Sequence, residues 1–340
     1  MSYKVFYSAD GVTKDITDFV TGIQYSGETG TAARKMEISV LQGTDFFVPK
    51  LRFRNGGMLI LFSEGKEIMR TVVFKQDRND KDTLKLTSYT HGIYLVKNKD
   101  TNRFEQLKAS QIAEKICRDF GIETGHIEDT KLIFPKLIFR DMTLWDMIVT
   151  ALTETTKRNG VKYKVLFKEG KLYIYEKRKQ LVSWVLKEGV NLLGANISSS
   201  IEDMKNQIKV VGKLTREDCQ NEMAGILINQ KLQRLYGVMQ EVREESGDNV
   251  DMSTVMQIAD NMLKELGREA IEADIEAIGL DEVEAGSALQ ITESTTGSTG
   301  LSGIFYVVQD EHSIEGNKHT MRLKLTRTDD IPVMNYEAPG

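Results

Sequence analysis

Two histidines are the residues in this sequence best placed by spacing for metal chemistry. His312 and His319 flank a predicted turn at Glu315-Gly316-Asn317, so adjacent strands would bring their imidazoles together. A structural zinc site needs four ligands, and catalytic zinc is often marked by His-Glu-x-x-His spacing. No third ligand is evident, and His91 and His126 stand in turn-like surroundings without a cysteine. We therefore expect two exposed hairpin histidines and neither a metal nor another cofactor.

Three further patterns suggest chemistry and lack a necessary residue. Asp77 to Asp82 resembles the start of a calcium loop, but lysine fills its fifth position and its sixth is not glycine. Thr296 to Gly303 is rich in glycine but lacks the Gly-Lys-Ser/Thr of a phosphate-binding loop. The carboxylates from Glu217 to Glu284 lie in polar runs that predict exposure, whereas a glycosidase needs one carboxyl buried with a raised pKa. No catalytic residue is predicted, and we expect a protein that is not an enzyme.

The size and composition are those of a soluble protein of two or three domains. The chain has 340 residues, about 40% of them apolar and 28% charged, with four prolines. Cys117 falls on the apolar stripe of a predicted helix, and we expect both it and Cys219 to be reduced packing residues. No apolar run approaches the roughly 18 residues of a membrane span, so no membrane insertion is expected.

Charge is distributed unevenly along the chain. The segment 97–187 holds 19 Lys and Arg against 12 Asp and Glu, whereas 216–286 holds 6 against 17. The lysines of the basic segment are spread over predicted helices and strands rather than gathered in one stripe with aromatic residues, so sequence-specific nucleic-acid binding is not expected. These charges either form solvated faces or meet complementary surfaces of other subunits.

The first ninety or so residues predict antiparallel strands that curl into a small barrel. Lys35 to Val40 alternates, with Met36, Ile38 and Val40 on one face and polar residues on the other. Apolar runs at 58–62 and 67–74 and an alternating run from Leu84 predict further strands. We assign 1–96 to an N-terminal tube-like β-barrel domain.

The next segment, 97–182, predicts a small α+β domain. A helix is expected over 107–120, with Ser110 as N-cap and Gly121 ending it in a left-handed conformation. Thr143 is placed to cap a second helix that stops at Gly160. A hairpin follows, with its turn at 168–171.

The last segment, 183–340, predicts a second tube-like β domain with an inserted helix. Ile208 to Val211 is a short strand, 253–266 an amphipathic helix, and 271–277 an alternating strand. The chain closes with a hairpin in which Met321, Leu323 and Leu325 alternate with polar residues. The fold class expected is therefore α+β and β-rich, with two tube-like β-barrel domains flanking a small α+β domain, and any similarity between the two barrels must be architectural.

Long stretches resemble one family. These are DITDFVTGIQYSGETGTAARKMEISVL, GGMLILFSEGKEIMRTVVFK, YTHGIYLVKNKDTNRFEQLKASQIAEKICRDFGI, MTLWDMIVTALTETTKRNG, DMKNQIKVVG and GLSGIFYVVQDEHSIEGNKHTMRLKLTRTD. They are similar to the XkdQ-type baseplate hub proteins of defective Bacillus prophages, related clostridial phages and tailocins. The resemblance covers nearly the whole chain in order and is weakest over 215–285.

The resemblance implies a structural hub subunit of a contractile tail. Three copies would form a ring whose six similar barrels meet the six-fold inner tube above and the three-fold spike below. The expected partners are further copies of the chain, the inner tail tube protein, the spike protein and baseplate wedge components, with the tape measure as a further candidate. The protein would fold in the bacterial cytoplasm and end in the tail baseplate. Ring-forming strands are expected at Met36, Ile38, Val40, Leu84, Leu86, Ile208, Val210, Met321, Leu323 and Leu325.

Two other functions fit a tail-associated protein. One is a hydrolase that cuts the cell wall, which digestion of peptidoglycan would reveal. The other is a wall-binding module in the middle domain, which a pull-down on intact cell walls would reveal. Neither accounts for strand-rich segments at both ends of the chain.

Overall fold

The computed structural model describes residues 2–42, 52–78, 83–177, 184–216, 219–247, 250–292 and 302–328, together with Met334 and Tyr336. The chain divides into two compact units. The first comprises Met1–Thr153, Lys162–Ile197 and Ala273–Gly340, and the second comprises Glu154–Val161 and Ser198–Glu272. No helix among the described residues is long and apolar enough to cross a membrane.

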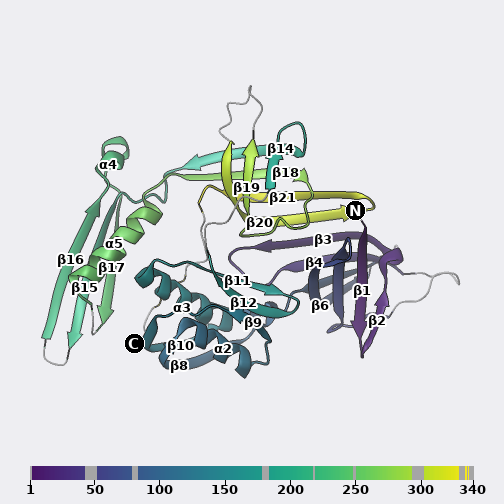
Figure 1. Ribbon diagram of the computed structural model, residues 1–340, viewed down its shortest axis with the longest axis horizontal. Coiled ribbons are helices and arrows are strands. Elements are labelled where there is room, and N and C mark those ends of the chain that lie inside the picture. The colour runs from purple at the N-terminus through teal and green to yellow at the C-terminus, as the bar shows by residue number, and fades with distance from the viewer. Residues whose placement is uncertain are drawn as a thin grey trace. The chain divides into compact units, whose positions relative to one another are not determined.

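The N-terminal part of the first unit is a strongly curled sheet (Figure 1). Its strands lie in the order β3-β4-β7-β6-β5-β1-β2. Although β1 and β3 are far apart along this path, Val5 of β1 and Ile23 of β3 belong to one buried cluster. The sheet therefore wraps round its own core, as the alternating sequence pattern predicts. The elements are β1 (Tyr3–Ala9), β2 (Val12–Asp15), η1 (Thr17–Phe19), β3 (Val20–Glu28), β4 (Lys35–Leu41), β5 (Met58–Ser63), β6 (Lys66–Arg78) and β7 (Thr83–Tyr89).

The C-terminal strands continue the same sheet. They follow the order β14-β18-β21-β20, and β20 pairs antiparallel with β3, from Gln309 opposite Glu28 to Ile314 opposite Ile23. The β20-β21 hairpin and the strand at 271–277 confirm the sequence prediction. The elements are β13 (Trp184–Lys187), β14 (Leu192–Ser200), β18 (Ala270–Ile278), β19 (Ala288–Thr292), β20 (Gly303–Glu315) and β21 (Lys318–Thr326).

The two halves of this sheet repeat one topology. The N-terminal strands lie side by side in the order β3-β4-β7-β6, and the C-terminal strands lie in the order β14-β18-β21-β20. In each half, the fourth strand along the chain therefore lies between the second and the third. In both halves the third strand has 13 residues and a register shift against the fourth, at 73–75 in β6 and at 307–309 in β20. Each third strand also pairs, through its first half, with an additional strand, β5 or β19. The expected architectural similarity of the two tube-like modules is thus present.

The α+β region between the two halves contains both predicted helices and the predicted hairpin, but it also contains strands at 99–108, 124–127 and 133–143 that were not predicted, and one cap differs. Gly121 and Gly160 follow their helices with positive φ of 65° and 72°, and the β11-β12 turn uses Glu169 and Gly170. The N-cap of α2 is Lys108 rather than Ser110, which is buried in the first turn. The elements are α1 (Ile93–Lys97), β8 (Lys99–Lys108), α2 (Ala109–Asp119), β9 (Thr124–Ile127), β10 (Ile133–Thr143), α3 (Leu144–Asn159), β11 (Tyr163–Lys168) and β12 (Lys171–Glu176).

The second unit contains a three-stranded sheet of its own, in the order β16-β15-β17. Ile208 and Val210 lie in β15 and pack against α5 in a separate hydrophobic cluster. The expectation that they line the wall of the second barrel is therefore wrong, because α5 covers the apolar face of their strand and they lie outside the large sheet. The elements are β15 (Gln207–Arg216), β16 (Cys219–Ile228), α4 (Gln230–Tyr236), β17 (Gln240–Gly247) and α5 (Met252–Leu266).

The strand-rich α+β fold class is confirmed. The domain boundaries after 96 and 182 stay predictions. Because β3 pairs with β20, strands from the two ends of the chain share one sheet.

Candidate functional site

One face of the large sheet is polar from β21 to β6. Residues directly opposite each other on neighbouring strands point to the same side of a sheet. One such row crosses six strands from β21 to β6 and consists of Thr320, Ser313, Gln24, Glu37, Thr87 and Lys75. A second row holds Arg322, Glu311, Ser26 and Lys35. The face is hollowed where Asn196, Glu276, Glu311 and Arg322 line one depression.

Charges on this face are partly neutralised by close pairs. The Glu37 carboxylate lies 3.0 Å from the ammonium of Lys35 and 3.2 Å from that of Lys85. Burial opposes ionisation of Glu37, but the hydrogen bonds from these two lysines lower its pKa. The face therefore stays hydrated and carries mixed charge. Such a surface suits contact with water better than it suits a dry protein interface.

The opposite face carries the predicted strand residues. Met36, Ile38, Val40, Leu84, Leu86, Met321, Leu323 and Leu325 are all buried on β4, β7 and β21. They form the core behind the polar face, as their alternation predicts. Their part in ring formation stays a prediction.

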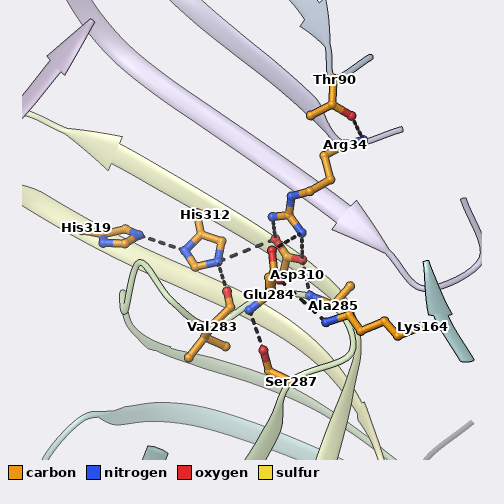
Figure 2. Close-up of polar contacts among 10 residues, drawn as sticks. All are labelled: Arg34, Thr90, Lys164, Val283, Glu284, Ala285, Ser287, Asp310, His312 and His319. Atoms are coloured by element: carbon orange, nitrogen blue, oxygen red, sulfur yellow. Dashed lines mark hydrogen bonds and ion pairs between the residues drawn. The ribbon is translucent and has the colours of Figure 1, made fainter. Parts of the chain in front are cut away.

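A buried ion pair lies where the two halves of the sheet meet (Figure 2). Arg34, from the loop between β3 and β4, donates from Nη1 and Nη2 to the two carboxylate oxygens of Asp310 at 2.8 and 2.6 Å. Asp310 is wholly buried in β20, and its Oδ1 also accepts a hydrogen bond from the backbone N–H of Ala285 at 2.7 Å. Arg34 approaches Glu284 at 3.9 Å, and Lys164 approaches the same carboxylate at 3.7 Å. This arrangement joins β20 to the N-terminal half with a bidentate, charge-assisted contact.

The two hairpin histidines continue this polar cluster. Nε2 of His312 lies 2.9 Å from the carbonyl oxygen of Val283, and because a carbonyl only accepts, this nitrogen carries the hydrogen. Nδ1 of His312 therefore accepts from Nε2 of His319, also at 2.9 Å. The hydroxyl of Tyr3, in β1, lies 2.8 Å from both His319 Nδ1 and Asp281 Oδ1, and it donates to one of them at a time. The hydrogen-bond chain thus links β1, β20, β21 and the loop before β19.

The expectation of exposed histidines is wrong. His312 is wholly buried and His319 is 7% exposed. The ring of Tyr25 stacks on that of His312, with 4.5 Å between the ring centroids, and Tyr3 and the 281–285 loop cover the pair. Burial lowers the pKa of His312 to about 3, with the nearby His319 and Arg34 acting in the same direction. A neutral, enclosed imidazole of this kind is a structural hydrogen-bonding group.

Among the residues that the structure describes, the other chemical candidates lie apart from one another. In the described residues no group of three His, Cys, Asp or Glu side chains is placed to hold a metal ion. His126 pairs with Glu128 at 3.2 Å on the surface, and His91 lies against Gly170. Cys117 is a buried free thiol whose pKa burial raises to about 12. Residues 79–82 and 296–301 lie outside the described residues, as does the side chain of Cys219.

Sequence reasoning missed the Arg34–Asp310 pair. The sequence does indicate that Asp310 is buried, since it occupies an apolar-face position of an alternating strand, between Val308 and His312. A carboxylate at such a position requires a partner, but the sequence does not say which of its many cations supplies it.

Comparison with known proteins gives concordant results. Residues 23–326 match the YqbQ-like family model. The PBSX phage-like element protein XkdQ of Bacillus subtilis is 31% identical over 279 residues, which cover 81% of this chain and 83% of that protein. The fold resembles that of the 43 kDa tail protein of prophage MuSo2 from Shewanella oneidensis, with a TM-score of 0.68 at 13% identity, covering 95% of this chain and 98% of that one.

A more distant likeness extends to secretion systems. The Escherichia coli c3393 protein, described as a type VI secretion component with structural similarity to the T4 tail proteins gp27 and gp5, gives a TM-score of 0.55 at 9% identity, covering 95% of this chain and 76% of that one. Identities this low establish a shared fold only. The family match extends from β3 to the end of β21, and the chain belongs to the YqbQ-like family.

Proposed function

We propose that this protein is the baseplate hub subunit of a contractile tail or tail-like particle, a structural protein that assembles into a homotrimeric ring. Each chain contributes two tube-like modules, so three chains contribute six. Such a ring matches a six-fold inner tube on one side and a three-fold spike on the other. Wedge components would bind at the periphery, and the tape measure is a further candidate partner.

The observation that supports this proposal most directly is the repeated strand order. Two modules of the same topology follow each other in one sheet, with a polar face on one side and a buried core on the other. A ring of such modules would present a continuous polar surface to its interior, with mixed charges of the kind seen around Glu37. Head-to-tail contacts between identical chains close into rings when the rotation per copy divides a full turn.

The mass of the purified protein in solution tests the ring. The expected value is that of three 38.5 kDa chains, with a ring seen in low-resolution images. A protein that stays monomeric at every concentration, including with the inner tube protein added, contradicts the proposal. A peptidoglycan digestion assay tests the absence of catalysis, and cleavage by the purified protein would favour the hydrolase instead.

A further inference from the structure

Among the described residues, the strand path of the large sheet ends in two edge strands of different character, and β13 forms a further edge beside β19. At one end, β2 is a four-residue strand with Lys14 and Asp15 along it. At the other end, β14 is a nine-residue strand, Leu192–Ser200, without a charged residue or proline. Among the described residues its one partner strand is β18, and Leu192 also forms an isolated bridge with Glu188. Soluble proteins usually protect an edge strand by shortness, charge or proline, because its free N–H and C=O groups pair with other chains. β2 is protected in this way and β14 is not.

A further free edge runs along half of β6. Residues 66–72 of β6 pair with β5, and residues 72–78 pair with β7 on the other side. On the β5 side, Gly56 and Gly57 still make backbone hydrogen bonds with Val73, and the Gln76 side chain donates to Asn55. Among the described residues, Lys75–Arg78 have a paired strand, β7, on one side alone. The equivalent strand of the other module, β20, uses its corresponding half, Gln309–Ile314, to pair with β3.

The repeated topology relates these two edges. Reading along the sheet, the third strand of the C-terminal module, β20, pairs with the first strand of the N-terminal module, β3. The third strand of the N-terminal module is β6, whose second half is open, and the first strand of the C-terminal module is β14, which is also open. The strands of both modules lie in the same order. The contact that β20 makes with β3 within one chain can therefore be repeated by β6 of one copy with β14 of the next.

We propose that β14 of one copy pairs antiparallel with Lys75–Arg78 of β6 in the next copy, as β3 pairs with β20 within each chain. This inference rests on the proposed ring and names the surfaces that close it. The contact is heterologous, joining different edges of two copies, as ring closure requires.

The side chains of the two edges are consistent with this pairing. Both β3 and β14 have nine residues. In β3, Ile23 and Tyr25 are buried on the core side, whereas Leu193, on the core side of β14, is 56% exposed. At the β6 edge, the residue at the register shift is Phe74, which is 38% exposed. With Asp77 opposite Ser198, Lys75–Arg78 would lie opposite Ile197–Ser200, and Leu193 would lie beyond the paired residues. Pairing would carry the polar rows of one chain into those of the next.

Superposing the modules by their register shifts gives the register to test. Position 311 of β20, paired with Ser26 of β3, corresponds to Asp77, and Ser26 corresponds to Ser198. Directly opposite residues of antiparallel strands have Cα atoms about 4.5–5.5 Å apart, which a disulfide spans. An Asp77→Cys, Ser198→Cys double variant, in a Cys219→Ser background, should therefore form covalent dimers and trimers on oxidation.

The control variant combines Asp77→Cys with Gly194→Cys. Gly194 lies on the same face of β14 but four residues from Ser198, roughly 13 Å along the strand, too far for a disulfide. A second pair of variants uses charge: Ile197→Lys should leave a monomer, while Val12→Lys on the protected edge β2 should still form the ring.

The outcomes separate this inference from the proposed function. A ring with the mass of three chains that gives no more cross-linking with Ser198→Cys than with Gly194→Cys overturns the edge assignment and leaves the hub proposal standing. A ring that persists in Ile197→Lys overturns it as well. A wild-type protein that never associates overturns both.

Discussion

Removal of Arg34 should destabilise the first unit more than removal of one partner of an exposed ion pair does. Asp310 is fully buried and accepts hydrogen bonds from both terminal nitrogens of Arg34 and from the N–H of Ala285. In an Arg34→Met variant, two of these three donors disappear and a carboxylate stays buried without its cation. Breaking a buried pair in this way costs about 3–5 kcal/mol.

The double variant Arg34→Met, Asp310→Asn should recover part of this loss. The asparagine is uncharged, and its carbonyl oxygen can still accept from Ala285, so the remaining cost is that of an imperfect polar site, about 1–2 kcal/mol. The two substitutions together should therefore cost about 2–3 kcal/mol less than Arg34→Met alone. Such non-additivity is expected only for groups in direct contact.

The fluorescence of Trp145 reports on this region in a Trp184→Phe background. Its indole N–H donates to the carbonyl of Gly30, in the same β3-β4 loop as Arg34, at 3.2 Å. In urea, a loss of 3–5 kcal/mol should lower the unfolding midpoint by about 1 M or more.

Arg103→Met is the matched control. Arg103 pairs with Glu105, and both side chains are at least half exposed, so its loss should cost about 0–1 kcal/mol. An Arg34→Met variant no less stable than Arg103→Met, or a double variant as unstable as the single one, would refute the reasoning.

Three further predictions follow from burial and close approach. Ile38→Asp or Leu323→Asp removes a wholly or almost wholly buried side chain, which should cost about 2–5 kcal/mol and abolish the trimer in sedimentation, whereas Lys324→Asp on the polar face should retain it. Because burial lowers the pKa of His312 from 6.5 to about 3, the unfolded chain takes up the proton first, and stability should fall as the pH drops below 6.5. The loss at pH 5 from this group is about 2 kcal/mol, and the difference between urea midpoints at pH 7 and pH 5 should shrink in His312→Phe. Gly92→Ala places a Cβ 2.0 Å from the carbonyl oxygen of Ala32 and should lower the melting temperature, whereas Gly30→Ala, with open space around it, should not.

Local patterns predicted the elements well because they depend on nearby residues. The alternation of Met36, Ile38 and Val40 identifies β4 and its buried face, since one-sided burial alone produces that pattern. The turn at Glu169-Gly170 follows from glycine's tolerance of positive φ. The prediction of Ser110 as the N-cap was wrong because Ser110 lies within the buried first turn, where its backbone N–H donates to the hydroxyl of Thr130.

What depends on distant residues was not predictable from one sequence. The alternation of Ile208 and Val210 shows that one face is covered, but α5 could not be recognised as the cover, and the strand was placed in the wrong sheet. His312 is buried by Tyr25 and Val283, which are 287 and 29 positions away along the chain. The repeated strand order is likewise a property of the pairing between strands that are far apart in the sequence.

The position of the second unit in the repeat explains how the sheet accommodates it. In the N-terminal module, the first and second strands are joined by the short loop that carries Arg34. In the C-terminal module, residues 201–269, the larger part of the second unit, stand at the same place in the chain, between β14 and β18. These two strands are neighbours, so the ends of the insertion are held close together whatever its length. Closure entropy grows only with the logarithm of loop length, and a segment with its own core offsets that cost by folding. The strand order of the module is therefore preserved, because the insertion lengthens one connection without changing which strands pair.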